Sequence, residues 1–443
     1  MMLAAARKCE ESAVSIEAAT TNRQWQRSVP LFRVPLLTRP FAVLCGLGAL
    51  ACVLALYREA VGLGPASGMN DNYAWGVWKT FNIMVLTGLG SGSFAIGIAV
   101  WIFGQRQLHA VMRTAVLSSF LTYASGLALL GVDVGRPWNF YSILMPWRWN
   151  AHSPMLEIAF CMPLYTAVPL LIENLPAALE ALSKRLPRFA FAFDAIEAVI
   201  RRIFPFVLAL GFLLPAMHQS SLGALMLLAG PQVHPLWQIP LLPLLYVGAA
   251  GFMGFAFVTF ILLVAHLVWE RPLDREVLRS MCRISTGIVA VWLALRALDL
   301  LLRGSLPLAF TATAPALLFW IETTLLIAAA IAAYSAARQS NPRRAFLASM
   351  LACVGGMLYR FDPTTLVYQP GLGASYFPSL IEIVITVGFV AAAIAAFCVV
   401  VKLTAILPAS LETWFEAERA EQHRQLHRQL RLVQSSIEYV AEA

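Results

Sequence analysis

Six ionisable side chains lie inside long apolar stretches of this chain, where a lipid bilayer would exclude them. Moving a charged group into hydrocarbon is costly, so such residues usually serve a site or pair with one another. Proton transfer, charge stabilisation and polar ligand binding are the chemistries open to these residue types. The six residues are Lys79, Glu157, His218, Arg296, Glu322 and Glu382.

A second group of candidates is concentrated in residues 131–157, which read GVDVGRPWNFYSILMPWRWNAHSPMLE. Trp and Tyr are common at a membrane–water interface, and that role accounts for several of them. The same mixture also suits a quinone, which needs flat apolar walls together with hydrogen-bond donors and proton carriers. The candidates are Asp133, Arg136, Trp138 and Tyr141, of which Asp133 and Arg136 can alternatively pair with each other.

Two helical segments contribute further polar residues. His218 and Gln219 interrupt the apolar run LLPAMHQSSLGALMLLAG. A histidine there suits proton transfer because its pKa lies near neutrality, although a neighbouring hydroxyl can also satisfy it. Tyr123 is expected to reach a similar depth. Lys79 lies one turn from Asn82, and its long side chain can either serve a site or extend toward water.

These residues must be positioned by membrane-spanning helices. Of 443 residues, 59% are hydrophobic and only 13% are charged, whereas soluble domains are about one quarter charged. Ten apolar runs are long enough to cross about 30 Å of hydrocarbon, which predicts an all-α polytopic membrane protein built of helix bundles. The glycine run TGLGSGSFAIG predicts close approach of another helix. The ten runs begin near Phe41, Trp75, His109, Ser153, Ile203, Ile239, Ile284, Ala316, Ala345 and Phe377.

The distribution of Lys and Arg predicts the orientation. An even number of helices puts both termini on one side, and 25 basic residues belong to that side against 5 in the opposite loops. The positive-inside rule therefore places both termini in the cytoplasm and explains the net charge of +8 without any nucleic acid. The six ionisable residues then all lie in the outer half of the membrane, and the inner half contains almost no titratable group apart from His266.

Ligands for metals and haem are sparse. The seven cysteines are scattered without a CxxC motif, and most lie in apolar stretches, where cysteine behaves as a small hydrophobe. A bis-histidine haem needs two histidines at matching depth on facing helices. His218 is expected in the outer half and His266 near the inner surface. We therefore predict neither a haem nor an iron–sulfur cluster in this chain.

The two ends of the chain differ from the apolar domain, which covers residues 40–408. Residues 1–39 carry charges and no apolar h-region, so we expect a cytoplasmic tail rather than a cleaved signal peptide. Residues 409–443 are rich in Glu, Arg and Gln at helical spacing. They predict a cytoplasmic helix, lying on the membrane or against a partner, or alternatively a plain solvated tail.

Several longer motifs resemble those of the polysulfide reductase membrane-subunit (NrfD-type) family, in particular the membrane subunit of hydrogenase-2-type nickel–iron hydrogenases. They occur in the same order, between about residue 40 and residue 408. The motifs are WGVWKTFN, LLGVDVGRPWNF, SPMLEIAFCMPLY, LLPAMHQSSLGALMLLAG followed by HPLWQ, and LLFWIE.

The resemblance implies a haem-free subunit of the bacterial inner membrane that reacts with quinone, either menaquinone or ubiquinone. It also implies two partners, a ferredoxin-like iron–sulfur subunit on the periplasmic face and a catalytic subunit of the nickel–iron hydrogenase type beyond it. The positions carried over for quinone binding and proton transfer are Tyr123, Asp133, Arg136, Glu157 and His218. The supporting buried polar positions are Lys79, Asn82, Trp138, Tyr141, Gln219, Arg296 and Glu322.

One departure from the resemblance concerns the inner half of the sixth helix, where relatives of the hydrogenase type can carry a glutamate. Ile261 occupies this position and cannot carry a proton, so no proton path from the cytoplasm is predicted, and His266 is a weak substitute. Two other functions fit the same residues. One is a passive anchor whose polar groups only hold helices together. The other is a secondary transporter, which usually has broken helices and polar groups along a two-sided path.

Overall fold

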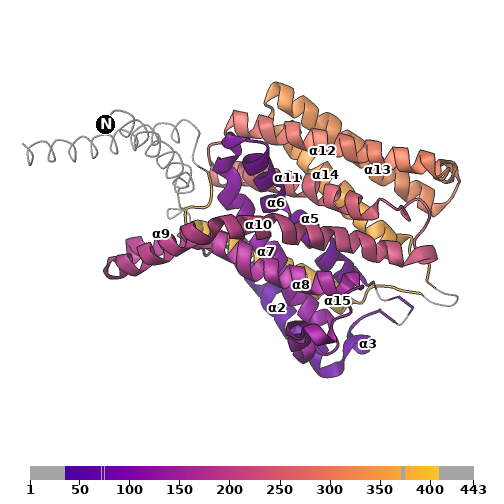
Figure 1. Ribbon diagram of the computed structural model, residues 1–443, viewed down its shortest axis with the longest axis horizontal. Helices are drawn as coiled ribbons and strands as arrows, with labels where there is room; N and C mark the ends of the chain where they lie inside the picture. The colour runs from indigo at the N-terminus through magenta and orange to yellow at the C-terminus, as the bar shows by residue number, and fades with distance from the viewer. Residues whose placement is uncertain (1–34, 71, 74, 371–374, 409–443) are drawn as a thin grey trace, which may run out of the picture.

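The computed structural model describes residues 35–70, 72–73, 75–370 and 375–408, and within them the regular secondary structure is helical apart from one isolated bridge between Asn70 and Tyr73. Ten helical segments of this described part are long and apolar enough to cross a membrane, which confirms the predicted fold class (Figure 1). The predicted terminal tails lie almost entirely outside the described residues. The ten spans are Arg39–Val61, Val77–Ile102, Arg106–Asp133, Pro154–Arg185, Pro187–Leu228, Leu242–Trp269, Arg275–Leu302, Ala314–Gln339, Pro342–Leu366 and Leu380–Leu403.

Capping residues set where several helices begin. Asp274 accepts hydrogen bonds from two backbone N–H groups at the start of α12 (Arg275–Leu302), and Asn341 does the same for α14 (Pro342–Phe361). Each cap satisfies N–H groups that have no partner within the first turn. The apolar run predicts a later start for α12, near Ile284. The helix begins earlier, at Arg275, because the Asp274 cap starts it there. Its first turns are charged, so they lie outside the apolar run.

The fourth and fifth spans continue well past the membrane. α10 (Ala190–Leu228) has 39 residues and measures about 58 Å, roughly twice the thickness of the hydrocarbon. Together with α9 (Leu171–Arg185) it forms a hairpin that projects past the neighbouring helices at the left of Figure 1. The apolar run near Ile203 predicts only the membrane-embedded part of α10. The charged residues before it extend the same helix into water.

The second span is the most enclosed part of the bundle, and it is discontinuous. Within its membrane window 94% of the residues are buried, against 17% for α2 (Arg39–Val61). Its regular hydrogen bonding is interrupted by wide π-helical turns, which occur frequently at functional sites. A break at Gly90 and Ser91 divides it. Its parts are α4 (Val77–Lys79), η2 (Thr80–Leu86), α5 (Thr87–Leu89), α6 (Gly92–Gly97) and η3 (Ile98–Ile102).

The helices form two bundles and a peripheral pair. The first bundle contains the second span, α7 (His109–Asp133), α8 (Pro154–Tyr165), α9 and α10. The second contains α11 (Leu242–Trp269), α12, α13 (Ala314–Gln339) and α14. The bundles meet where α11 packs against α6 and α10, and where α14 packs against η2. α15 (Leu380–Leu403) pairs with α2, and both helices contact α7.

The bundles approach each other closely at Gly254 of α11 and Gly92 of α6, which confirms the prediction made from the glycine run. A Cβ atom added to Gly254 would lie 2.7 Å from the backbone nitrogen of Gly92. We expect Gly254→Ala to lower the free energy of unfolding by about 1–3 kcal/mol, measured by denaturation in detergent micelles. Gly287→Ala is the matched control, because nothing lies within 4 Å of its added Cβ. Equal losses in the two variants would contradict this packing.

The loops alternate between the two ends of the bundle. One end, the low-charge face, consists of residues 62–70, 134–153, 229–241, 303–313 and 375–379. The other end, the basic face, consists of residues 103–108, 186–189, 270–274, 340–341 and 404–408, and most of the Lys and Arg residues that the structure describes lie in it or in the adjoining parts of the helices. The spans run alternately from one face to the other.

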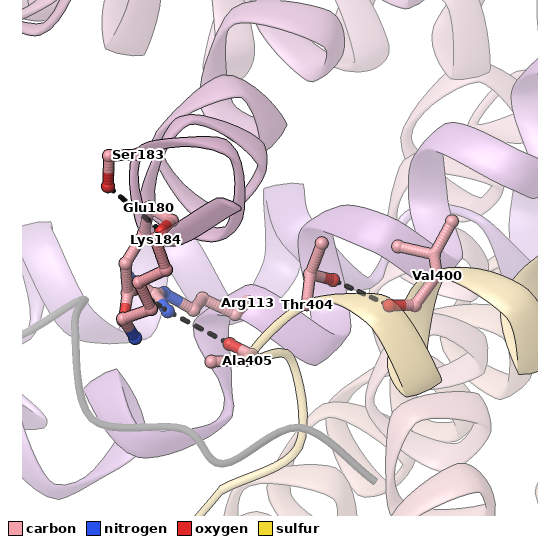
Figure 2. Close-up of polar contacts among 7 residues, drawn as sticks. All are labelled: Arg113, Glu180, Ser183, Lys184, Val400, Thr404 and Ala405. Atoms are coloured by element: carbon pink, nitrogen blue, oxygen red, sulfur yellow. Dashed lines mark hydrogen bonds and ion pairs between the residues drawn. The ribbon is translucent and has the colours of Figure 1, made fainter. Parts of the chain in front are cut away.

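The basic face contains a buried guanidinium, that of Arg113. Arg113 lies in α7, and its Nη1 atom lies 3.2 Å from Glu180 Oε2 and donates to Ala405 O at 2.9 Å (Figure 2). Glu180 also pairs with the exposed Lys184 at 2.8 Å. Because one arginine binds both α9 and the segment after α15, it holds that segment against the first bundle.

Candidate functional site

The deepest polar cluster lies where the two bundles meet. Tyr123 and His218 are buried, and each lies ten residues before the low-charge end of its helix, about 15 Å below that face. Their predicted similar depth is therefore confirmed. Gln219 Nε2 donates to Tyr123 Oη at 3.3 Å and to Thr87 Oγ1 at 3.1 Å. Arg360 reaches the same region from α14. These five residues are the central cluster.

His218 is the least satisfied residue of the central cluster. Its side chain is completely buried, yet neither ring nitrogen has a hydrogen-bond partner among the described residues. The hydroxyl groups of Ser220 and Ser221 donate to other acceptors. The His218 ring lies 5.7 Å from that of Tyr123, which packs edge-to-face on Tyr165 at 4.9 Å. Buried polar atoms are nearly always hydrogen-bonded, so unpartnered ones indicate a site for water or a ligand.

Glu157 connects this depth with the protein surface. It lies in the first turn of α8 and is exposed. Its carboxylate accepts a hydrogen bond from Ser221 Oγ. Ser221 follows His218 by three residues, so it lies one helical turn nearer the low-charge face and on the same side of α10. Glu157 and His218, two of the predicted site residues, are therefore brought to neighbouring turns of α8 and α10.

Asp133 pairs with Lys79 and not with Arg136. Lys79 Nζ lies 3.1 Å from Asp133 Oδ2, and Trp78 Nε1 donates to Asp133 Oδ1 at 3.0 Å. Arg136 lies beyond the end of α7 and is exposed. The alternative of an Asp133–Arg136 pair is therefore wrong, because the last turn of α7 packs against α4. The Lys79–Asp133 pair lies at the low-charge end of α7, about 15 Å from the level of Tyr123.

The aromatic residues of the segment 131–157 lie at the surface. Trp138 and Tyr141 belong to η5 (Pro137–Leu144), and both are exposed. This placement is typical of a membrane-interface belt or a contact surface, not of the walls of a buried ligand site. Asn82, in contrast, is buried in η2, and its amide oxygen has no hydrogen-bond partner in the described part of the chain.

A second buried cluster lies within the second bundle. Arg296 of α12 forms an ion pair with Glu322 of α13, and Trp237 Nε1 donates to Glu322 Oε2 at 3.1 Å. The alternative pairing of Arg296 with Asp299 is wrong, because Asp299 pairs with Arg303 at 2.6 Å. Aromatic rings enclose the Arg296 guanidinium at 4.8–5.8 Å from their centroids, a cation–π arrangement. The rings are those of Trp237, Trp292, Phe319 and Tyr359.

Two buried charges are missing from the predicted site. Arg360 is one of the five basic residues that the sequence assigns to the loops opposite the termini, but it lies in the last turn of α14 and is completely buried. Asp362 begins η11 (Asp362–Leu366), and neither of its carboxylate oxygens has a hydrogen-bond donor among the described residues. The sequence YRFDPTT does contain a signal. Two opposite charges at the end of an apolar helix, between aromatic residues, are costly unless they face the protein interior.

Glu382 belongs to neither cluster, and local contacts account for its burial. It forms a capping box with Ser379 at the start of α15. It also accepts hydrogen bonds from Gly68 N at 2.6 Å and from Tyr376 Oη at 2.7 Å. Burial raises the pKa of Tyr376, so this hydroxyl remains a donor. The spacing of Ser379 and Glu382 is a capping-box signature that is visible in the sequence.

Comparison with known proteins decides the family. The family model described as polysulphide reductase, NrfD, matches residues 65–369. The chain belongs to the NrfD family. The match includes both bundles, with the central cluster and the Arg296–Glu322 pair, and leaves out the peripheral helices α2 and α15. The family resemblance of the sequence motifs is thereby confirmed.

Two relatives of this NrfD protein have informative names. The probable Ni/Fe-hydrogenase 2 b-type cytochrome subunit of Escherichia coli K12 is 34% identical over 376 residues, which cover 84% of this chain and 93% of that protein. The integral membrane subunit of menaquinone reductase from Nitratidesulfovibrio vulgaris is 28% identical over 333 residues, which cover 70% of this chain and 76% of that protein.

The name of the Escherichia coli relative mentions a b-type cytochrome, whose haem is often held between two histidines on facing helices. The described histidines of this NrfD protein do not form such a pair. His109 packs edge-on against Trp101 at 5.2 Å, and His266 Nδ1 lies 2.6 Å from Arg271 O. The described histidines therefore do not fit a haem held between two of them. The others are His152 and His234 in loops of the low-charge face and His218 deep in α10, while His423 and His427 lie outside the described residues.

Proposed function

We propose that this NrfD protein is the membrane subunit of a periplasm-facing respiratory redox complex, and that it exchanges electrons between an iron–sulfur partner subunit and membrane quinone. The central cluster is the observation that supports this most. It brings Tyr123, His218 and Arg360 together between two bundles, a common place for ligand sites, and it contains polar atoms without partners. Menaquinone and ubiquinone both suit this chemistry. The name of the Nitratidesulfovibrio vulgaris relative favours menaquinone.

In this proposal the low-charge face is periplasmic, because the positive-inside rule assigns the basic face to the cytoplasm. A ferredoxin-like iron–sulfur subunit docks on the low-charge face, and a catalytic subunit of the nickel–iron hydrogenase type lies beyond it. The name of the Escherichia coli relative supports the hydrogenase assignment. Exposed aromatic side chains, those of Trp138, Tyr141 and Trp147, provide an apolar surface for that contact.

Protons are proposed to pass between the periplasm and the quinone site through Glu157, Ser221 and His218. Glu157 is exposed and accepts the Ser221 hydroxyl hydrogen, and Ser221 lies one turn from His218 on α10. Carboxylate, hydroxyl and imidazole groups on neighbouring turns can exchange protons in sequence. Asp133, in its pair with Lys79, is a second exchange point nearer the low-charge face. On the side of the basic face, Ile261 of α11 is apolar and cannot exchange protons with the quinone site.

The two alternative functions have weaker support. A passive anchor would be expected to pair its buried polar groups, whereas His218 and Arg360 have unpartnered atoms in the described structure. A secondary transporter would share the broken second span, but its site needs a polar path to both faces. Near the basic face, the buried Arg113 already binds Glu180 and Ala405, so its side chain does not contribute to such a path.

Purification of the tagged full-length chain from its native membranes tests the proposal. We expect an iron–sulfur subunit and a catalytic subunit to co-purify. We also expect the complex to pass electrons both to a soluble quinone and to a redox dye that accepts them directly from the partner subunit. A complex that remains active with the dye but shows no activity with quinones would contradict the proposed function. Isolation of the chain without any redox partner would favour the transporter.

A further inference from the structure

Arg360 is a buried cation without a counter-charge. Its side chain is completely buried, and none of the ion pairs among the described residues includes it. Only its Nη2 atom forms a hydrogen bond, to the carbonyl oxygen of Tyr246 at 3.0 Å, while Nε and Nη1 have no partner there. A guanidinium keeps its proton in proteins, so its charge and its free N–H groups require another partner.

The aromatic surroundings of Arg360 offset only part of the free-energy cost of burying its charge. The guanidinium lies 4.8 Å from the ring centroid of Tyr246, a cation–π contact that is weaker than an ion pair in a buried setting. Arg296, in the same bundle, has aromatic neighbours too, but it also has the carboxylate of Glu322. The difference between the two arginines is therefore the missing anion at Arg360.

The Arg360 guanidinium extends from the second bundle toward the first. A Cβ atom added to Gly88 would lie 3.1 Å from Arg360 Nε and 3.2 Å from its Cζ, so this glycine leaves the space that the guanidinium fills. Gly88 follows Thr87, whose hydroxyl binds Gln219 of the central cluster. Gln219 also donates to Tyr123 at 3.3 Å, and the Tyr123 ring lies 5.7 Å from that of His218. The free N–H groups of Arg360 and the unpartnered nitrogens of His218 therefore belong to one buried site.

We propose that Arg360 binds a ring oxygen of the quinone, donating hydrogen bonds from Nε or Nη1 and supplying the counter-charge that favours an anionic oxygen. This inference rests on the proposed function and adds the residue that recognises the charge of the substrate. Hydrogen bonds from a charged donor to an anionic acceptor are about twice as strong as those between neutral groups. A fixed cation also stabilises negative charge that develops on that oxygen when electrons arrive before protons.

Binding of two quinone analogues to the purified complex tests this assignment. The first is a hydroxynaphthoquinone that is an anion at neutral pH, and the second is its neutral methyl ether. We expect the wild-type complex to bind the anion more tightly, and we expect Arg360→Gln to reduce this preference at least about 10-fold. Arg360→Lys keeps the charge and should retain part of the preference. Arg303→Gln, which removes a guanidinium paired with Asp299 at 2.6 Å, is the control and should retain all of it.

Gly88→Ala is a second variant that shifts the guanidinium without changing its charge, and we expect it to weaken the preference for the anion. Its control is Gly251→Ala, whose added Cβ meets Ile288 at an ordinary 3.8 Å. An unchanged preference in Arg360→Gln, in a complex that still turns over quinone, would overturn the role of Arg360 and leave the proposed function intact. A wild-type complex that binds neither analogue and turns over no quinone would overturn both.

Discussion

Replacing His218 with leucine is expected to reduce quinone-linked turnover by about 100-fold or more and to leave the complex assembled. General acid–base catalysis contributes about 100- to 10,000-fold, and His218 is the proton-carrying group at the centre of the proposed site. Leucine is of similar size and apolar, and the side-chain nitrogens of His218 have no hydrogen bonds among the described residues that the substitution would break. The measurement compares the rate with quinone and the rate with a dye that accepts electrons from the partner subunit.

The pattern across variants separates a proton-transfer role from a packing role. In His218→Leu the dye rate should remain at the wild-type level, because the partner subunit is unaffected. His152→Leu, in an exposed loop of the low-charge face, should change neither rate. Asp133→Leu should lower the quinone rate as well, and it also deprives Lys79 of its ion-pair partner. Normal quinone turnover in both the His218 and the Asp133 variants would favour the passive anchor.

Replacing Arg296 with methionine is expected to lower the free energy of unfolding by about 3–5 kcal/mol, measured by denaturation in mixed detergent micelles. The substitution leaves the carboxylate of Glu322, which is 0% exposed, in the second bundle without its guanidinium. Breaking a buried pair on one side costs this much because the remaining charge is uncompensated. Arg303→Met is the control. Its pair with Asp299 is partly exposed and should contribute about 1 kcal/mol or less.

The double variant Arg296→Met/Glu322→Met completes the test. Replacing both members of a buried pair by apolar side chains of similar volume is often neutral, so we expect the double variant to recover most of the stability lost in Arg296→Met. The double-mutant cycle then gives a coupling energy of about 2 kcal/mol or more. Additive losses would show that the two side chains stabilise the bundle independently.

The two buried arginines of the second bundle are therefore expected to behave in opposite ways. Arg296 has a carboxylate partner, so its removal creates an unpaired charge. Arg360 has no such partner in the described structure, so replacing it with glutamine removes an unpaired charge and is not expected to destabilise the bundle. A stability loss in Arg296→Met together with a binding loss in Arg360→Gln would assign one arginine to folding and the other to the ligand.

The number and order of the membrane-spanning helices could be predicted from the sequence because they depend on local composition. A hydrocarbon layer of about 30 Å demands an apolar helix of about twenty residues, whatever the neighbouring helices do. The glycine run of the second span likewise indicated close packing, although not its partner at Gly254. Helix ends were predicted less accurately, since a capping residue such as Asp274 begins a helix well before its apolar part.

The pairing of the charges was decided only by the tertiary structure. Asp133 and Lys79 are 54 residues apart, and Arg296 lies 26 residues from Glu322, so no spacing rule joins them. The nearer alternatives were both wrong, because the rotation of each helix directs its charges toward whichever helix packs beside it.

For the central cluster too, part of the arrangement could be predicted from the sequence and part depended on the tertiary structure. From the sequence it was possible to predict that polar groups such as His218 and Tyr123 share one depth, since depth follows from the distance along a helix of known rise. It was not possible to predict that Arg360 lies opposite Gly88, because the sequence does not show which helices pack against each other. Local chemistry determined the helices and the level of the site, and the packing of separate helices decided which side chains meet there.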